Sequence, residues 1–200
     1  MCCKAKPAPI VSNITIKHVL DENPDTSDLG EYTDKLEPGV IVRCFGEFYE
    51  KLPAPMERDY DGRFLGKGKP YDLPSRGGRE YRGFKPEAGG EKPGTADYYQ
   101  YGIQDWKRMK ALDQYDWYYM GITAKAEVRY QERPGGVWRI LRFTSYGLWG
   151  IESDSDAGYL QSIEDEQLAD LQDQLQRFGV DLSNFDALAK IAKETVEEAV

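Results

Sequence analysis

DWYYMGITAKAEVRYQERPGGVWRILRFTSYGLW, residues 116–149, carries the strongest structural signal in the chain. Its first part, 116–132, is rich in the aromatic and β-branched residues that are typical of strands. The turn Pro134-Gly135-Gly136 separates it from a second run of the same kind. Two such runs joined by a short glycine turn predict a β-hairpin. Alternate residues of the second strand should face opposite sides: Val137, Arg139, Leu141 and Phe143 on one, Trp138, Ile140 and Arg142 on the other.

The remaining elements are predicted on both sides of this hairpin. Residues 11–20 alternate as a half-buried strand does, and 40–52 indicates another strand. Thr95 is a good N-cap for a helix that follows it. After residue 151 a stripe of apolar residues from Leu160 to Phe178 predicts a helix that stops at Gly179.

A second C-terminal helix is expected after Ser183 and Asp186, which resemble a capping box, and it should extend as far as Val196. The stretch 53–95 is rich in proline and glycine, has no sustained period, and is expected to be a long irregular insertion.

Together these elements predict an α+β fold. It consists of a mostly antiparallel four-stranded sheet, one central helix, the irregular insertion and two acidic C-terminal helices. The predicted organisation is a flexible tail at 1–10, an α+β domain at 11–150 and a helical segment at 151–200 that packs on the domain.

Charge is distributed unevenly along the 200 residues. The net charge is −9, yet residues 151–200 hold 13 acidic against three basic side chains, or −10. Charge asymmetry of this kind concerns partners rather than fold. We therefore expect a non-enzymatic binding protein whose acidic surface docks on a basic protein surface. The candidate binding residues are Glu164, Asp165, Asp170 and Asp173.

The acidic loops offer a second hypothesis, a metal-dependent hydrolase. Asp25, Asp28, Asp154 and Asp156 follow predicted strands, and carboxylates of this kind bind Mg²⁺ or Ca²⁺. The EF-hand spacing is not met. These acids have a structural interpretation as well: Ser155 or Asp156 can cap free N–H groups at a helix start, where carboxylates also meet the positive end of the helix dipole. No cofactor is expected beyond such a divalent metal.

A third hypothesis is a nucleic-acid-binding module through the loop 58–85. This loop has a net charge of +4 and interleaves aromatic residues with bases. Its candidate binding residues are Arg76, Arg79, Arg82 and Tyr81. Single-stranded nucleic acid binders combine such groups. The acidic chain as a whole makes nucleic acid the weaker partner prediction, and the favoured alternative is that the loop folds against the acidic tail of its own chain.

Histidine chemistry is scarce. His18 is the one histidine and belongs to the apolar face of the first strand, which favours a structural role. The three cysteines have no metal-type spacing.

With no membrane-spanning or signal-like segment, the expected location is the cytoplasm. No membrane partner is expected, and self-association stays an alternative.

Three runs carry a family resemblance: NPDTSDLGEYTDKLEPGVIVR at 23–43, FKPEAGGEKPG at 84–94 and GLWGIESDSD at 147–156. They resemble a family of uncharacterised small acidic bacteriophage proteins, across most of residues 12–178. The resemblance implies no catalytic residues. It implies only a setting, a phage product inside a bacterial host. By analogy with other small acidic phage proteins, we expect an inhibitor of a host nucleic-acid-handling or defence protein.

Overall fold

The structure is a computed structural model that describes residues 7–35, 37–42, 75–76 and 79–199. The chain divides into two compact units. Unit 1 combines residues 1–24 with 118–200, and unit 2 is formed by 25–117. The two chain segments of unit 1 are therefore neighbours in space despite their separation in sequence.

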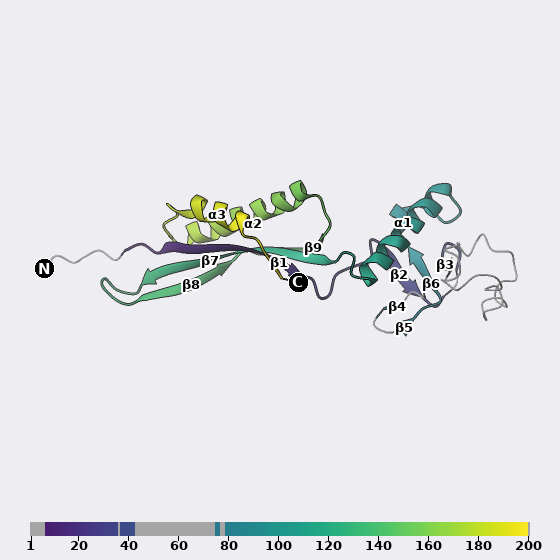
Figure 1. The fold of residues 1–200 in the computed structure, drawn as a ribbon, viewed down its shortest axis with the longest axis horizontal. Helices are drawn as coiled ribbons and strands as arrows, with labels where there is room; N and C mark the ends of the chain where they lie inside the picture. Colours follow the sequence, from purple (N-terminus) through teal and green to yellow (C-terminus); the bar gives the residue numbers. More distant parts are fainter. Residues whose placement is uncertain (1–6, 36, 43–74, 77–78, 200) are drawn as a thin grey trace. The chain divides into compact units, whose positions relative to one another are not determined.

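Unit 1 is built on a five-stranded sheet (Figure 1). Its strands are β1 (Ile10–Leu20), β7 (Tyr119–Gln131), β8 (Trp138–Thr144), β9 (Leu148–Glu152) and β10 (Glu197–Ala199). β7 is the central strand and pairs antiparallel with β1 on one side. On its other side it pairs antiparallel with β8 and β9, which follow each other along the same edge. β10 pairs parallel with the end of β1.

Two helices cover one face of this sheet, α2 (Ala157–Arg177) and α3 (Phe185–Glu194) (Figure 1). The core lies between the helices and the sheet. Leu171 and Leu175 of α2 are fully buried there against Ile16 and Ile122 of the sheet. Apolar burial of this kind is the main stabilising term of the unit.

The helix ends of unit 1 follow local chemistry. The Asp156 carboxylate accepts hydrogen bonds from the N–H groups of Gly158 and Tyr159, so it is the N-cap of α2. Gly179 ends the helix with a φ of 70°, a left-handed conformation that glycine adopts without strain.

Unit 2 contains a small sheet and one helix. β6 (Gly83–Pro86) pairs with β2 (Gly30–Thr33) and with β3 (Ile41–Val42), and β4 (Ser75–Arg76) pairs with β5 (Arg79–Glu80). A short 3₁₀ turn, η3 (Ala88–Gly90), precedes α1 (Ala96–Asp113). The Thr95 hydroxyl accepts from the N–H of Tyr98 and caps α1 as predicted.

The α+β class and the hairpin of β7 and β8 are confirmed. Four details differ from the sequence expectations. The predicted strand 40–52 is described at 40–42, of which 41–42 join the sheet of unit 2, and its remainder lies outside the described residues. The second C-terminal helix ends at Glu194 and a strand follows, because residues near Val196 continue to the edge of β1. Its N-cap is Asn184, without a side-chain bond. Phe178, the last residue of the apolar stripe that predicted the first C-terminal helix, is 71% exposed rather than buried.

The predicted insertion is partly regular. Residues 53–74 and 77–78 lie outside the described part, while 75–95 contain β4, β5, β6 and η3. The unit boundaries also differ from the predicted ones, since 25–117 forms one compact unit and the strands on either side of it pair with each other.

Candidate binding surface

The sheet of unit 1 has two unlike faces. Side chains alternate along a strand, so Ile14 and Ile16 with their partners Ala126 and Ala124 point toward the helices. The opposite face carries no helix among the described residues of unit 1 and is called the open face (Figure 1). These residues of β7 and β8 belong to it: Lys125, Glu127, Arg129, Gln131, Trp138, Ile140, Arg142 and Thr144, of which Gln131 is buried.

The outer strand β8 is exposed on both faces. Trp138 is 49% and Ile140 50% exposed on the open face, while Leu141 is 42% exposed on the helix side. Each of these side chains has large apolar area in contact with water. An exposed apolar patch of this kind marks an interaction site more often than a scattered single residue does.

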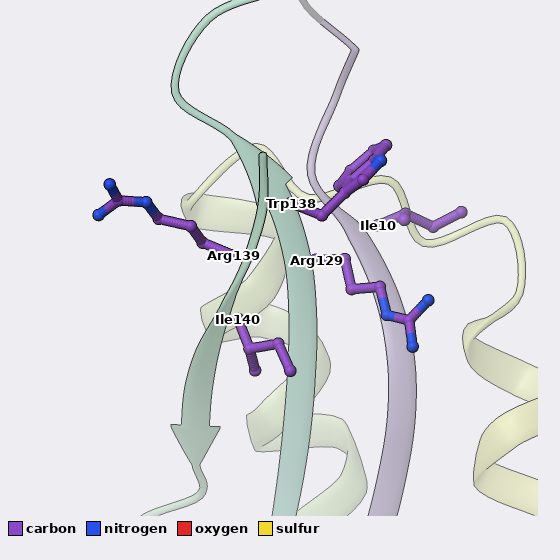
Figure 2. A pocket seen from close by; sticks show the side chains of 5 residues that line it. All are labelled: Ile10, Arg129, Trp138, Arg139 and Ile140. Atoms are coloured by element: carbon purple, nitrogen blue, oxygen red, sulfur yellow. The ribbon is translucent and has the colours of Figure 1, made fainter. Parts of the chain in front are cut away.

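A hollow of about 530 Å³ lies at the end of the open face. Ile10, Arg129, Trp138 and Ile140 line it, and Figure 2 shows their side chains on the same side of the strands. Arg139 belongs to the lining through its position in β8, but its side chain points away from the other four (Figure 2). The hollow thus combines apolar walls with the guanidinium of Arg129.

The open face is basic around this hollow. Lys125 and Arg129 are exposed and, among the described residues, form no ion pair. Arg142 contacts the carboxylate of Glu127 at 3.1 Å, which leaves the patch with a positive balance. An acidic partner would approach this surface with a favourable long-range potential.

A second tryptophan lies further along the open face. Trp149 of β9 packs its ring on Gly121 of β7, where an added Cβ would meet the ring at 2.4 Å. Glycine at 121 therefore permits the close approach of the ring to the strand. Trp149 remains half-exposed.

The four acidic candidates of α2 do not form a free anionic surface. Glu164 is 8% exposed and its Oε1 lies 3.0 Å from Nε2 of His18. Asp165 forms an ion pair with Lys193. Glu164 is therefore part of the packed structure rather than an exposed acid, and its role in binding stays a prediction.

The other two candidates also have partners within unit 1. Asp170 accepts from the N–H of Tyr146 at 2.9 Å, and Asp173 pairs with Arg177 at 2.5 Å along the helix. The His18–Glu164 pair fits the structural role that the sequence favoured for this histidine, since both side chains are 11% exposed.

The four proposed metal ligands are divided between the two units of the chain, so the metal hypothesis stays a prediction. Among the described residues, no three His, Cys, Asp or Glu side chains gather where they could hold an ion. Asp25 and Asp28 belong to unit 2, whereas Asp154 and Asp156 belong to unit 1. Asp156 acts as the N-cap of α2 instead.

Turn hydrogen bonds account for two perturbed carboxyls. The Ser27 N–H donates to Asp25 and lowers the pKa of that carboxyl. The Ser183 N–H lowers the pKa of Asp181 in the same way. Both groups are fully exposed, and such turns are common in loops.

Asp105 of α1 is perturbed in the opposite direction. Burial raises the pKa of its carboxyl, and the nearby carboxyls of Asp28 and Glu87 raise it further. The N–H of Ala88 donates to it at 2.7 Å and opposes this rise. Asp105 thus fastens η3 to α1.

Most of the basic loop 58–85 lies outside the described residues. Arg76 and Arg79 belong to the short strands β4 and β5. The Tyr81 ring stacks on Tyr32 at 5.4 Å, and the backbone N–H of Arg82 donates to Asp34. The nucleic-acid prediction for this loop therefore stays a prediction.

Sequence reasoning missed the open face as a site. The signal was present in WRILRFT at 138–144, where apolar residues occupy both alternating positions while the strand lies at the edge of the sheet. Whether a strand lies at the edge of a sheet depends on the tertiary fold. The alternation in the sequence therefore predicted a strand but not its place at the edge.

Comparisons with protein-family models, curated proteins and solved structures found no match to this chain. The predicted kinship with small acidic phage proteins therefore stays a prediction. No helix among the described residues has the length and apolar character needed to cross a membrane.

Proposed function

We propose that the protein is a non-enzymatic binding protein that docks another protein on the open face of its unit 1 sheet. The observation that carries the proposal is the hollow of Ile10, Arg129, Trp138 and Ile140. Half-exposed tryptophan and an arginine beside apolar walls are the residue types that contribute most to protein interfaces.

The side chains in and around the hollow indicate which residue types a partner segment should present. Lys125 and Arg129 favour a segment with acidic side chains, and Trp138 and Ile140 favour apolar side chains next to them. An extended or helical segment that presents an acidic residue beside a large apolar one would satisfy both. The partner surface inferred here is thus acidic, the opposite of the basic surface that the charge of residues 151–200 suggested.

A protein partner fits the open face better than single-stranded nucleic acid does. Trp138 lies beside Gln131 and Trp149 beside Gly121, positions about 33 Å apart at the rise of a strand. Successive bases of one strand stack on aromatic rings that lie close together. The two tryptophans are too far apart to form one stacking platform.

The setting implied by the family resemblance is part of the proposal. A phage product that binds a host nucleic-acid-handling or defence protein would act by occupying a surface, without catalysis of its own. The acidic helices would then contribute solubility and packing, because their candidate acids already have partners in the chain.

The test is a comparative capture experiment from nuclease-treated bacterial lysate, at low and moderate salt, read by mass spectrometry. We expect wild-type protein to retain one stoichiometric partner and Arg129→Glu and Trp138→Ser to lose it. Glu166→Lys is the matched control, because Glu166 is an exposed acid of α2 on the helix side.

Two results would contradict the proposal. The first is a partner that Arg129→Glu and Trp138→Ser still retain. The second is a partner lost on Glu166→Lys alone, which would return the docking surface to the acidic helices. Thermal unfolding of each variant checks that the fold is intact.

A further inference from the structure

Among the described residues, other segments of the chain cover the β1 edge of the unit 1 sheet but not the β8 edge. The β1 edge is covered, since Asn184 donates to the carbonyl of Val11 at 2.7 Å, the N–H of Asp181 donates to Pro9, and β10 pairs with 17–19. The β8 edge has no such cover among the described residues. Uncovered edges present a row of free backbone groups to other strands.

The phase of the hydrogen bonds identifies the outward groups of β8. The N–H of Ser145 donates to the carbonyl of Ala124 at 2.8 Å, so this pair bonds directly. Bonded pairs alternate along an antiparallel ladder, and Phe143, Leu141 and Arg139 therefore also bond to β7. The N–H and C=O groups that point away from β7 belong to Trp138, Ile140, Arg142 and Thr144.

Protected edges usually carry charged side chains, above all lysine, or proline or a bulge, or are very short. β8 carries the charges of Arg139 and Arg142 but none of the other devices. β8 has seven residues, is free of proline and presents Trp138 and Ile140 on one face and Leu141 on the other. Phe178 at the end of α2 is 71% exposed beside Phe143, with ring centroids 5.0 Å apart. A ligand bound to one face of the sheet would cover only the exposed apolar side chains of that face. A strand added beside β8 in the plane of the sheet would contact the apolar side chains of both faces.

We infer that β8 pairs antiparallel with β8 of a second copy of this chain about a two-fold axis at Leu141. In this register Arg142 lies opposite Ile140 of the second copy, and Arg139 lies opposite Phe143 of the second copy. Every arginine of β8 thus faces an apolar or aromatic side chain, and an arginine over a phenylalanine ring is favourable.

The strand pattern limits the register in which a second copy can pair. β8 contains two arginines and no acid, so any register that set Arg139 or Arg142 opposite its own copy would place like charges together. The register centred on Leu141 avoids both and pairs all seven residues. In this register the outward N–H and C=O groups of Trp138, Ile140, Arg142 and Thr144 form hydrogen bonds with those of the same four residues in the second copy.

This inference goes beyond the proposed function and does not depend on it. Leu141 lies on the helix side of the sheet, whereas the hollow lies on the open face. The paired sheets would carry two hollows on one continuous open face, so a dimer could still bind its partner.

The experiment measures the mass of the full chain by light scattering after size exclusion, up to about 100 μM, where a dimer of micromolar Kd is largely formed. Wild type is expected at twice 22.8 kDa. Leu141→Lys places two ammonium groups together at the axis and is expected to yield monomer. Val137→Lys is the matched control, because Val137 is 82% exposed and precedes the strand.

A disulfide test covers the case in which Leu141→Lys unfolds. With Cys2, Cys3 and Cys44 replaced by serine, Leu141→Cys should cross-link two copies on mild oxidation, since the axis pair has Cα atoms about 4.5 Å apart. Val137→Cys should not. A monomeric wild type, or a dimer that survives Leu141→Lys and yields no Leu141→Cys cross-link, would overturn the inference.

Discussion

A comparison of Glu164→Lys with Glu166→Lys distinguishes a buried acid from an exposed acid on the same helix. Glu164 is 8% exposed and contacts His18 at 3.0 Å, whereas Glu166 is exposed two residues later. Glu164→Lys removes an acceptor from His18 and brings an unpaired ammonium into a nearly buried site. Glu166→Lys makes the same charge change where water solvates the new group.

The expected magnitudes differ clearly. Breaking a buried pair and leaving a charge without a partner costs about 3–5 kcal/mol. A surface change of the Glu166→Lys kind stays within about 0.5 kcal/mol. Glu164→Gln keeps a side-chain oxygen near His18 and should lose only about 1 kcal/mol. Because a domain is stable by about 5–15 kcal/mol in total, Glu164→Lys should be visibly destabilised.

Urea unfolding followed by circular dichroism measures the free energy of unfolding of all three variants. The predicted order of stability is Glu166→Lys, then Glu164→Gln, then Glu164→Lys. Equal midpoints for Glu164→Lys and Glu166→Lys would refute the buried pair and restore Glu164 as a surface residue.

Three further predictions concern packing, capping and pH. Gly121→Ala should displace the Trp149 ring, red-shift tryptophan fluorescence and cost about 1–3 kcal/mol in a urea titration; unchanged fluorescence would contradict the contact. Asp156→Ala should cost about 0.5–2 kcal/mol in the same assay through loss of the α2 cap. The folded pKa of Asp105 lies above 3.8, so its contribution to the free energy of unfolding falls as pH rises from 3.8 through the folded pKa. Asp105→Asn should remove that slope from a series of melts, and an unaltered slope would contradict it.

Local chemistry made part of the fold predictable from the sequence. The turn at 134–136 and the alternation on both sides of it specified the hairpin, including which residues of β8 share a face. Thr95 was recognisable as a cap, and the cap of α2 was predicted at Ser155 or Asp156, because a cap depends on a few neighbouring residues.

Long-range pairing made the rest unpredictable. His18 and Glu164 lie 146 positions apart, so nothing near Glu164 in the sequence shows that it is buried. The strand β10 joins β1 from the far end of the chain, and residues 25–117 form a unit of their own between two strands that pair. The open face became visible only when β8 was seen at the edge of the sheet with helices on one side.

Hydrogen exchange of the protein with and without its captured partner tests the docking surface most directly. Docking on the open face should slow exchange in peptides that contain Arg129 and residues 138–144, with peptides of 161–174 unchanged. Slowed exchange confined to 161–174, with 129 and 138–144 unaffected, would contradict it and place the partner on the acidic helices.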